Sequence, residues 1–252
     1  MVLVLANVPS VRTVYVRRVG DTHMRLPHLL LILSLGVVTL SGAEPYDRQD
    51  WLLENALVIV ALPLLVCGYR FLRFTNGAYF ALFGLLCLHE VGAHFTYSLV
   101  PYADWLMRLG ITPSNPQISR NGYDRCVHMA YGVLVMPATL ELFSSRGSPE
   151  GIWRYIFPLT FVMAHSTIYE LLEWAAASLF GGSLGQAYLG TQGDPWDAQK
   201  DMLMASSGAA LALLTFALAT KLRLALNRMG GHSAHPVRGR APGEPGAPPP
   251  LP

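Results

Sequence analysis

The residues best suited to chemistry in this sequence are histidines and carboxylates that occur in pairs about one helical turn apart. These pairs are Glu90 and His94, Asp124 and His128, Glu170 and Glu173, and Asp197 and Asp201. Side chains three or four residues apart project from the same face of a helix, so each pair can act at one point. Imidazole and carboxylate groups together are ligands for Zn, Mn or Fe, and they also form proton-transfer pairs. The spacing therefore predicts either a divalent-metal site or a proton-transfer site.

The segments that carry these pairs are strongly apolar. Of the 252 residues, 52% are hydrophobic and only 13% are charged, whereas about a quarter of the residues in an average soluble domain are charged. Three cysteines are too few for a disulfide-stapled secreted module. The net charge of +2 argues against a nucleic-acid partner. The composition indicates a protein whose solvent is the lipid bilayer, with membrane lipids as its first partners.

Six apolar segments are long enough, at about 20 residues, to cross a bilayer. They are Leu26–Ala43, Trp51–Phe71, Tyr79–Val100, Cys126–Phe143, Tyr155–Leu179 and Met202–Leu222. Backbone polar groups in hydrocarbon must be satisfied within the segment, which requires helices, and the alternation typical of a β-barrel is absent. The sequence predicts an all-α, polytopic membrane protein with about six transmembrane helices in a domain of residues 26–222.

The positive charges predict the orientation of these spans. Thirteen of the eighteen Lys and Arg residues lie on one side: before the first span, after the second, between the fourth and fifth, and after the sixth. Segments on the cytoplasmic side carry the excess of Lys and Arg. We therefore expect a multi-pass membrane protein with both termini in the cytoplasm.

The two ends of the chain lie outside this predicted domain. Residues 1–25 form an N-terminal extension, and Met24 is an alternative start. The small residues Ser41-Gly42-Ala43 resemble a signal-peptide cleavage site, and cleavage there would leave five helices. Residues 223–252 are rich in Pro and Gly and predict a disordered cytoplasmic tail.

The predicted topology brings the ionisable residues of four spans to one level, in the half nearest the periplasm. Ionisable groups inside a membrane are costly and by default mark a functional site. The predicted metal ligands are His89, His94, Asp124, His128, Asp197 and Asp201. The predicted general bases are Glu90, Glu170 and Glu173.

A structural interpretation of the same residues stays open. Acids at the start of a helix, such as Asp124 and Asp197, can stabilise it by interaction with the helix dipole. Arg120, Arg125 or Lys200 could form salt bridges with the carboxylates inside the spans. The cluster would then hold helices together without doing chemistry.

Four ordered motifs resemble the YjdF-type family of bacterial inner-membrane proteins. They are the runs 89–97 (HEVGAHFTY), 120–128 (RNGYDRCVH), 169–174 (YELLEW) and 190–202 (GTQGDPWDAQKDM). The resemblance covers Pro45–Leu222 and implies a polytopic inner-membrane protein, but no activity. A more distant resemblance is to VanZ-like membrane proteins, from which the chain departs because Glu173 and Asp201 stand where that pattern has amides.

Three kinds of function fit these observations. The first is a metal-dependent membrane enzyme that acts on a lipid or a small envelope-derived substrate, because a metal held by His and carboxylates can activate water. The second is a proton-coupled transporter, which also uses intramembrane His and Glu. The third is a non-catalytic scaffold whose polar cluster fixes helix packing.

Overall fold

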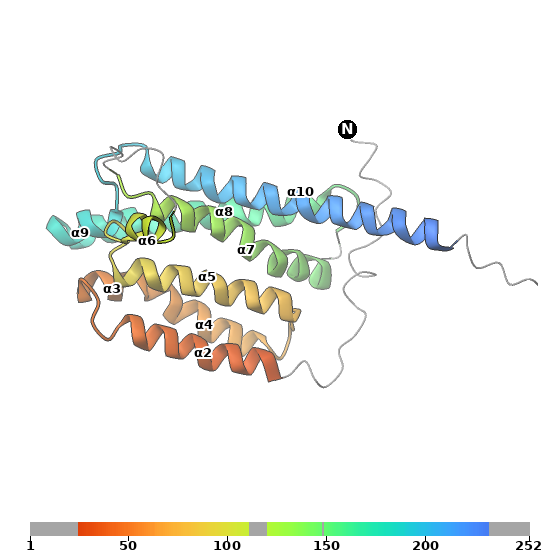
Figure 1. The fold of residues 1–252 in the computed structure, drawn as a ribbon, viewed down its shortest axis with the longest axis horizontal. Coiled ribbons are helices and arrows are strands. Elements are labelled where there is room, and N and C mark those ends of the chain that lie inside the picture. The colour runs from red at the N-terminus through yellow and green to blue at the C-terminus, as the bar shows by residue number, and fades with distance from the viewer. Residues whose placement is uncertain (1–24, 111–119, 148, 232–252) are drawn as a thin grey trace, which may run out of the picture. The chain divides into compact units, whose positions relative to one another are not determined.

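The structure is a computed structural model that describes residues 25–110, 120–147 and 149–231 (Figure 1). The described residues form helices and connections, with no strand among them. The all-α fold class predicted from the sequence is confirmed. The predicted N-terminal extension lies almost entirely outside the described residues, and so does the predicted tail from residue 232 onward.

The helices follow the predicted spans closely. They are α2 (Arg25–Ser41), α3 (Arg48–Glu54), α4 (Ala56–Gly68), α5 (Asn76–His94), α6 (Tyr102–Arg108), α7 (Tyr123–Arg146), α8 (Trp153–Phe180), α9 (Gly182–Leu189) and α10 (Asp197–Gly231). The second predicted span is divided at Asn55 into α3 and α4. The last helix continues nine residues beyond Leu222, where the sixth predicted span ends.

Judged by length and composition alone, three segments of the described residues are long and apolar enough to cross a membrane. They are Arg48–Gly68, Tyr123–Arg146 and Asp197–Asn227. The first helix has a shorter apolar stretch, Leu26–Ser41. Helices α5 and α8, of 19 and 28 residues, are not among these three segments, and both carry ionisable residues in their C-terminal halves. The membrane character of the fold is therefore clear, whereas the number of six spans stays a prediction.

The chain divides into two compact units, Met1–Phe216 and Ala217–Pro252. In the first unit α5 packs against both α2 and α7, and α7 packs against α8. Figure 1 shows α2, α4 and α5 lying alongside one another. A core of Met136, Leu140, Val162, Ala209 and Leu213 joins α7, α8 and α10. The described part of the second unit is the remainder of α10.

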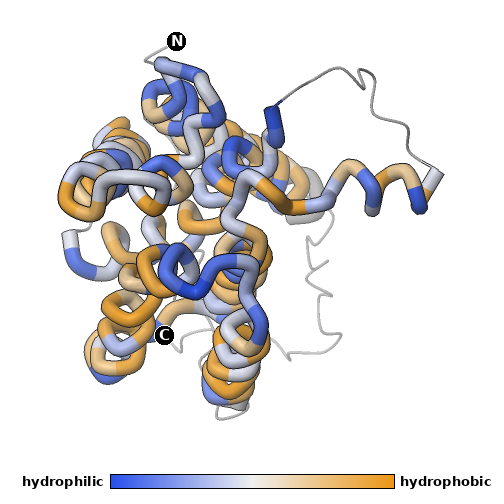
Figure 2. Tube along the Cα trace, turned by 90° about the vertical axis from the view of Figure 1, so that its left-hand side faces the viewer, coloured by the Kyte–Doolittle hydropathy of each residue, from blue (hydrophilic) through white to orange (hydrophobic). Residues whose placement is uncertain are grey.

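The two ends of the helices in the first unit differ in character. One end carries the short helices α3, α6 and α9, and Figure 2 looks at this end, where hydrophilic connections lie in front of hydrophobic helices. At the other end the buried Glu141 accepts hydrogen bonds of 2.7 Å from the backbone and the hydroxyl of Thr75. These bonds join the start of α5 to α7, because Thr75 is also the N-cap of α5.

Small residues let α7 and α10 approach each other closely. A Cβ atom on Gly132 would lie only 2.0 Å from the backbone oxygen of Ala205, and one on Gly208 would lie 2.2 Å from the oxygen of Met129. Glycine and alanine at helix contacts allow such close approach in membrane proteins. This crossing fixes the relative position of the first turns of both helices.

Candidate metal centre

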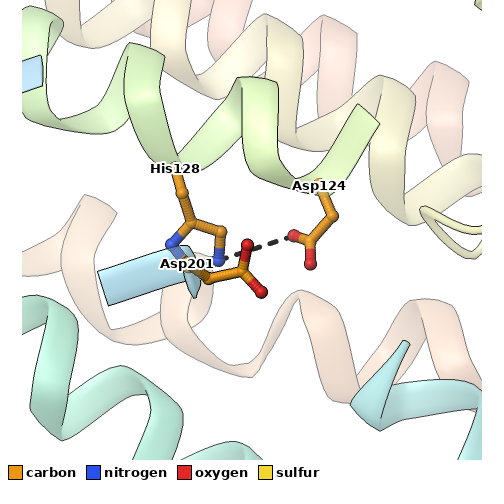
Figure 3. Close-up of side chains that lie close together, drawn as sticks. All are labelled: Asp124, His128 and Asp201. Atoms are coloured by element: carbon orange, nitrogen blue, oxygen red, sulfur yellow. Dashed lines mark ion pairs between the residues drawn. The ribbon is translucent and has the colours of Figure 1, made fainter. Parts of the chain in front are cut away.

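The first turns of α7 and α10 bring Asp124, His128 and Asp201 together. One ligand atom from each residue lies within 4.8 Å of the others. Figure 3 shows the three side chains converging, and Nε2 of His128 lies 3.5 Å from a carboxylate oxygen of Asp124. Two carboxylates and one imidazole are a ligand set suited to Zn, Mn or Fe, and three protein ligands leave a position for water or substrate.

The close helix crossing explains why these residues meet. On α7, Asp124 and His128 lie two turns and one turn before Gly132, so all three share one face. On α10, Asp201 lies one turn before Ala205, which contacts Gly132. The helix faces that touch at Gly132 and Ala205 are therefore the same faces that carry Asp124, His128 and Asp201 one or two turns earlier.

Two of the three side chains are buried, and few positive charges lie close to them. Asp201 is 2% exposed and His128 is 8% exposed. The oxygen Oδ1 of Asp201 accepts no hydrogen bond from the described residues, and Nε of Arg125 lies 3.8 Å from it. Burying a carboxylate without a partner is unfavourable. A proton or a metal cation at this position would relieve that cost.

The predicted general base Glu170 lies beside the cluster. Its carboxylate is 3.6 Å from Nε2 of His128, and its side chain comes from α8. Glu173, one turn further along α8, lines with Glu170 a cavity of about 450 Å³ under the loop before α10. The structure thus places Glu170 beside the Asp124, His128 and Asp201 group, with Glu173 next to it on α8.

His89 lies near the cluster but is held by a tyrosine. Its Nδ1 is 2.6 Å from the hydroxyl of Tyr97, and it lines the same large cavity as Asp124 and His128. Tyr97 and its neighbour Thr96 have φ values of 49° and 52°. Such values are strained for residues with large or branched side chains. The fold therefore holds the Tyr97–His89 pair against a local backbone cost.

Two of the other predicted site residues face the end of α2. Nδ1 of His94 lies 2.8 Å from the carbonyl oxygen of Ser41. The hydroxyl of Ser41 donates to the carboxylate of Glu90 and accepts a hydrogen bond from the indole of Trp51. The structure does not bring His94 or Glu90 into the group of three ligand atoms. Their contacts instead join α2, α3 and α5.

Asp197 takes part in an ion-pair network with the loop before α10. It pairs with Arg120, and Arg125 lies 2.5 Å from Asp194 and 3.3 Å from Asp197. Lys200 contacts Asp194 at 2.6 Å. The structural interpretation predicted that these cations would pair with the carboxylates inside the spans, Glu170 and Glu173, but neither has a Lys or Arg within 4.0 Å among the described residues. Asp201, just before the sixth predicted span, lies 3.8 Å from Arg125.

Sequence reasoning missed two buried acids on α3. Asp50 is 1% exposed and Glu54 is 5% exposed, and Glu54 accepts a 3.5 Å hydrogen bond from the hydroxyl of Tyr169 on α8. Neither oxygen of Asp50 has a hydrogen-bond partner among the described residues. The signal was present, because these acids are four residues apart, but the predicted second span began at Trp51 and left Asp50 outside it.

Comparison with known proteins agrees with this membrane architecture. Residues 26–221 match the family described as Predicted membrane protein (DUF2238). The chain belongs to this family. It is 31% identical over 198 residues to the inner membrane protein YjdF of Escherichia coli strain K12, an alignment that covers 74% of this chain and 90% of that relative. No solved structure matches.

The family membership confirms the resemblance found in the sequence motifs. The similar protein from Escherichia coli is named as an inner membrane protein, which agrees with the predicted location of this chain. The family's description names no activity. Any function must therefore be argued from the site itself.

Proposed function

We propose that Asp124, His128 and Asp201 bind a divalent metal ion, and that the protein uses it to act on a membrane lipid or a lipid-linked envelope compound. The observation that carries this proposal is the convergence of three ligand atoms within 4.8 Å from two helices. The unsatisfied oxygen of the buried Asp201 is an independent sign that a cation belongs there.

The metal would supply Lewis-acid chemistry, lowering the pKa of a bound water or polarising a carbonyl or phosphoryl group. The chain's own residues would prepare the site for that role. Asp124, 3.5 Å from Nε2 of His128, would share the metal with that imidazole. Glu170 has no role as a ligand in this scheme and lies close enough, 3.6 Å from His128, to serve as the general base.

The charge distribution supports a periplasmic position for this site. Most Lys and Arg residues flank the opposite ends of the predicted spans. A lipid or an envelope compound would then reach the cluster from the outer leaflet.

A proton-coupled carrier is the second candidate. The observation that favours it is a further polar pair one turn beyond His128, in which the hydroxyl of Tyr131 lies 2.8 Å from Nδ1 of His165. Both residues line the same cavity as His128. A substrate-dependent pH change inside sealed vesicles would support this candidate over the enzyme.

Metal analysis of the purified full-length protein tests the first candidate. We expect about one Zn, Mn or Fe per chain by mass spectrometry after purification in mild detergent. The variants His128→Ala and Asp201→Asn should lose the metal, whereas Asp104→Asn, an exposed acid on α6, should keep it. Size-exclusion profiles would confirm that all four proteins are folded.

The opposite result is equally clear. A folded wild-type protein that contains no metal, after purification without chelator and with metals supplied, would contradict the metal proposal. The carrier would then be tested next, and the absence of a pH response would leave a structural cluster.

A further inference from the structure

A cavity in the first unit has a volume of about 470 Å³ and a mostly apolar wall. Asp124, His128 and Tyr169 are among its polar lining residues. Most of the remaining wall consists of aliphatic side chains from α2, α4 and α5, among them Leu62 and Leu86. The candidate metal centre therefore opens directly into an apolar chamber.

The cavity is elongated along the helices. On α4 its lining residues run from Leu57 to Val66, a distance of about 14 Å at the rise of an α-helix. One leaflet contributes about 15 Å, half of the hydrocarbon core of a bilayer. The apolar chamber thus has the depth of a single leaflet.

We propose that this cavity holds one hydrocarbon chain of a membrane lipid, with the lipid headgroup at the Asp124, His128 and Asp201 cluster. This inference rests on the proposed function and specifies its substrate as a lipid bound by its tail. Apolar cavities do not hold water stably. The predicted spans are surrounded by the hydrocarbon chains of lipids, so a lipid chain is the apolar molecule available to fill the cavity.

Helix α4 forms the wall through which such a chain would enter. None of its thirteen residues is buried. Leu62 and Leu65 line the cavity, whereas Ile59 and Leu64 are 65% and 66% exposed on the other side of the helix. A single apolar helix therefore separates the chamber from the surrounding lipid.

A second cavity provides room for a polar headgroup. It has a volume of about 450 Å³, and its lining includes Glu170, Glu173 and Gln186. Glu170 lies 3.6 Å from His128, which lines the apolar cavity. The cluster thus lies between an apolar chamber and an acidic one, which is the arrangement that an amphipathic ligand requires.

Photo-crosslinking tests this inference on the full-length protein. The probe is a phospholipid with a diazirine in one acyl chain, in vesicles of phosphatidylethanolamine and phosphatidylglycerol, and labelled residues are identified by mass spectrometry. We expect labelling of Leu82 and Leu86, which line the cavity, in addition to exposed residues such as Phe80.

A matched pair of substitutions on α4 gives the control. Leu62→Trp would fill the cavity and should reduce labelling of Leu82 and Leu86 by about fivefold or more. Leu64→Trp adds the same side chain on the exposed face and should leave that labelling unchanged. Equal labelling in both variants, or wild-type labelling confined to exposed residues such as Phe80, would overturn the proposal.

The same samples separate this inference from the metal proposal. Asp201→Asn should lose the metal but keep the labelling of Leu82 and Leu86, because the cavity wall is intact. Labelling that depends on Leu62 in a wild-type protein without metal would support the lipid cavity and contradict the metal centre. Wild-type mapping alone decides the question if Leu62→Trp does not fold.

Discussion

Two groups of acids lie at the same end of the helices and differ in how their charge is balanced. Asp194 and Asp197, at the loop before α10, contact Arg120, Arg125 and Lys200. Asp50 and Glu54 on α3 and Asp124 on α7 have no Lys or Arg within 4.0 Å among the described residues. Asp201 has only Arg125, at 3.8 Å.

The difference separates structural acids from candidate functional ones. Removing one partner from a buried ion pair leaves an uncompensated charge and is destabilising. Removing a buried acid that no cation contacts at hydrogen-bond distance relieves a cost and should be tolerated. We therefore expect the loop acids to stabilise the fold and the second group to contribute little to its stability, which is typical of groups that bind or transfer something.

The largest expected effect comes from the helix crossing on which both groups depend. Gly132→Ala places a methyl group 2.0 Å from the backbone of Ala205, so the helices must separate. We expect the free energy of unfolding to fall by about 3 kcal/mol and metal binding to be lost. Thermal unfolding in detergent measures the first effect, and metal analysis measures the second.

Gly84→Ala on α5 is the matched control, because a Cβ atom at Gly84 meets nothing within 4 Å. Its unfolding midpoint should equal or slightly exceed that of the wild type, since alanine favours a helix over glycine. A wild-type midpoint in Gly132→Ala would show that the crossing does not position the cluster.

A smaller loss of stability is expected when the ion-pair network is broken. Arg120→Gln removes the partner of Asp197, whose side chain is 5% exposed. We expect the free energy of unfolding to fall by about 2 kcal/mol, while the Asp124, His128 and Asp201 group keeps its metal. Arg108→Gln, at an exposed position on α6, should change neither quantity.

Asp201→Asn should lose the metal without losing stability, which is the reverse of what we expect for Arg120→Gln. After chelation of any metal, its unfolding midpoint should be no lower than that of the chelated wild type, because it removes a buried charge. If Asp201→Asn were as destabilising as Arg120→Gln, the distinction between structural and functional acids would be wrong.

The smallest expected effect is a pH dependence at the loop. Hydrogen bonds from Lys200 and from the backbone of Trp196 hold the pKa of Asp194 below its usual range. A group whose pKa is lowered by folding stabilises the folded state fully above its pKa in the unfolded chain, about 3.9 for Asp. That stabilisation is lost as the pH falls below this value toward the folded-state pKa. The unfolding midpoint should therefore fall less steeply below pH 4 in Asp194→Asn than in the wild type, and parallel curves would exclude this contribution.

Much of the fold follows from the sequence because apolar segments in a bilayer have few alternatives to a helix. Each predicted span overlaps a helix of the structure, and the α7 pair Asp124 and His128 follows from spacing on one helix. The break between α3 and α4 at Asn55 was not predicted, since no proline or glycine marks it. Asp50 and Glu54 were missed for a different reason: the predicted span began at Trp51, so the start of α3 was treated as the edge of a span.

Composition and helical spacing were enough to predict an all-α membrane protein whose ionisable residues lie near the ends of particular helices. Helical periodicity is local, so it identifies pairs on one helix. Which pairs meet became visible only when the helices were packed together. Asp201 joins His128 because Gly132 lets α10 approach α7, whereas His94 is turned toward Ser41. Contacts between helices depend on side-chain volume at distant positions, which no spacing within a single helix records.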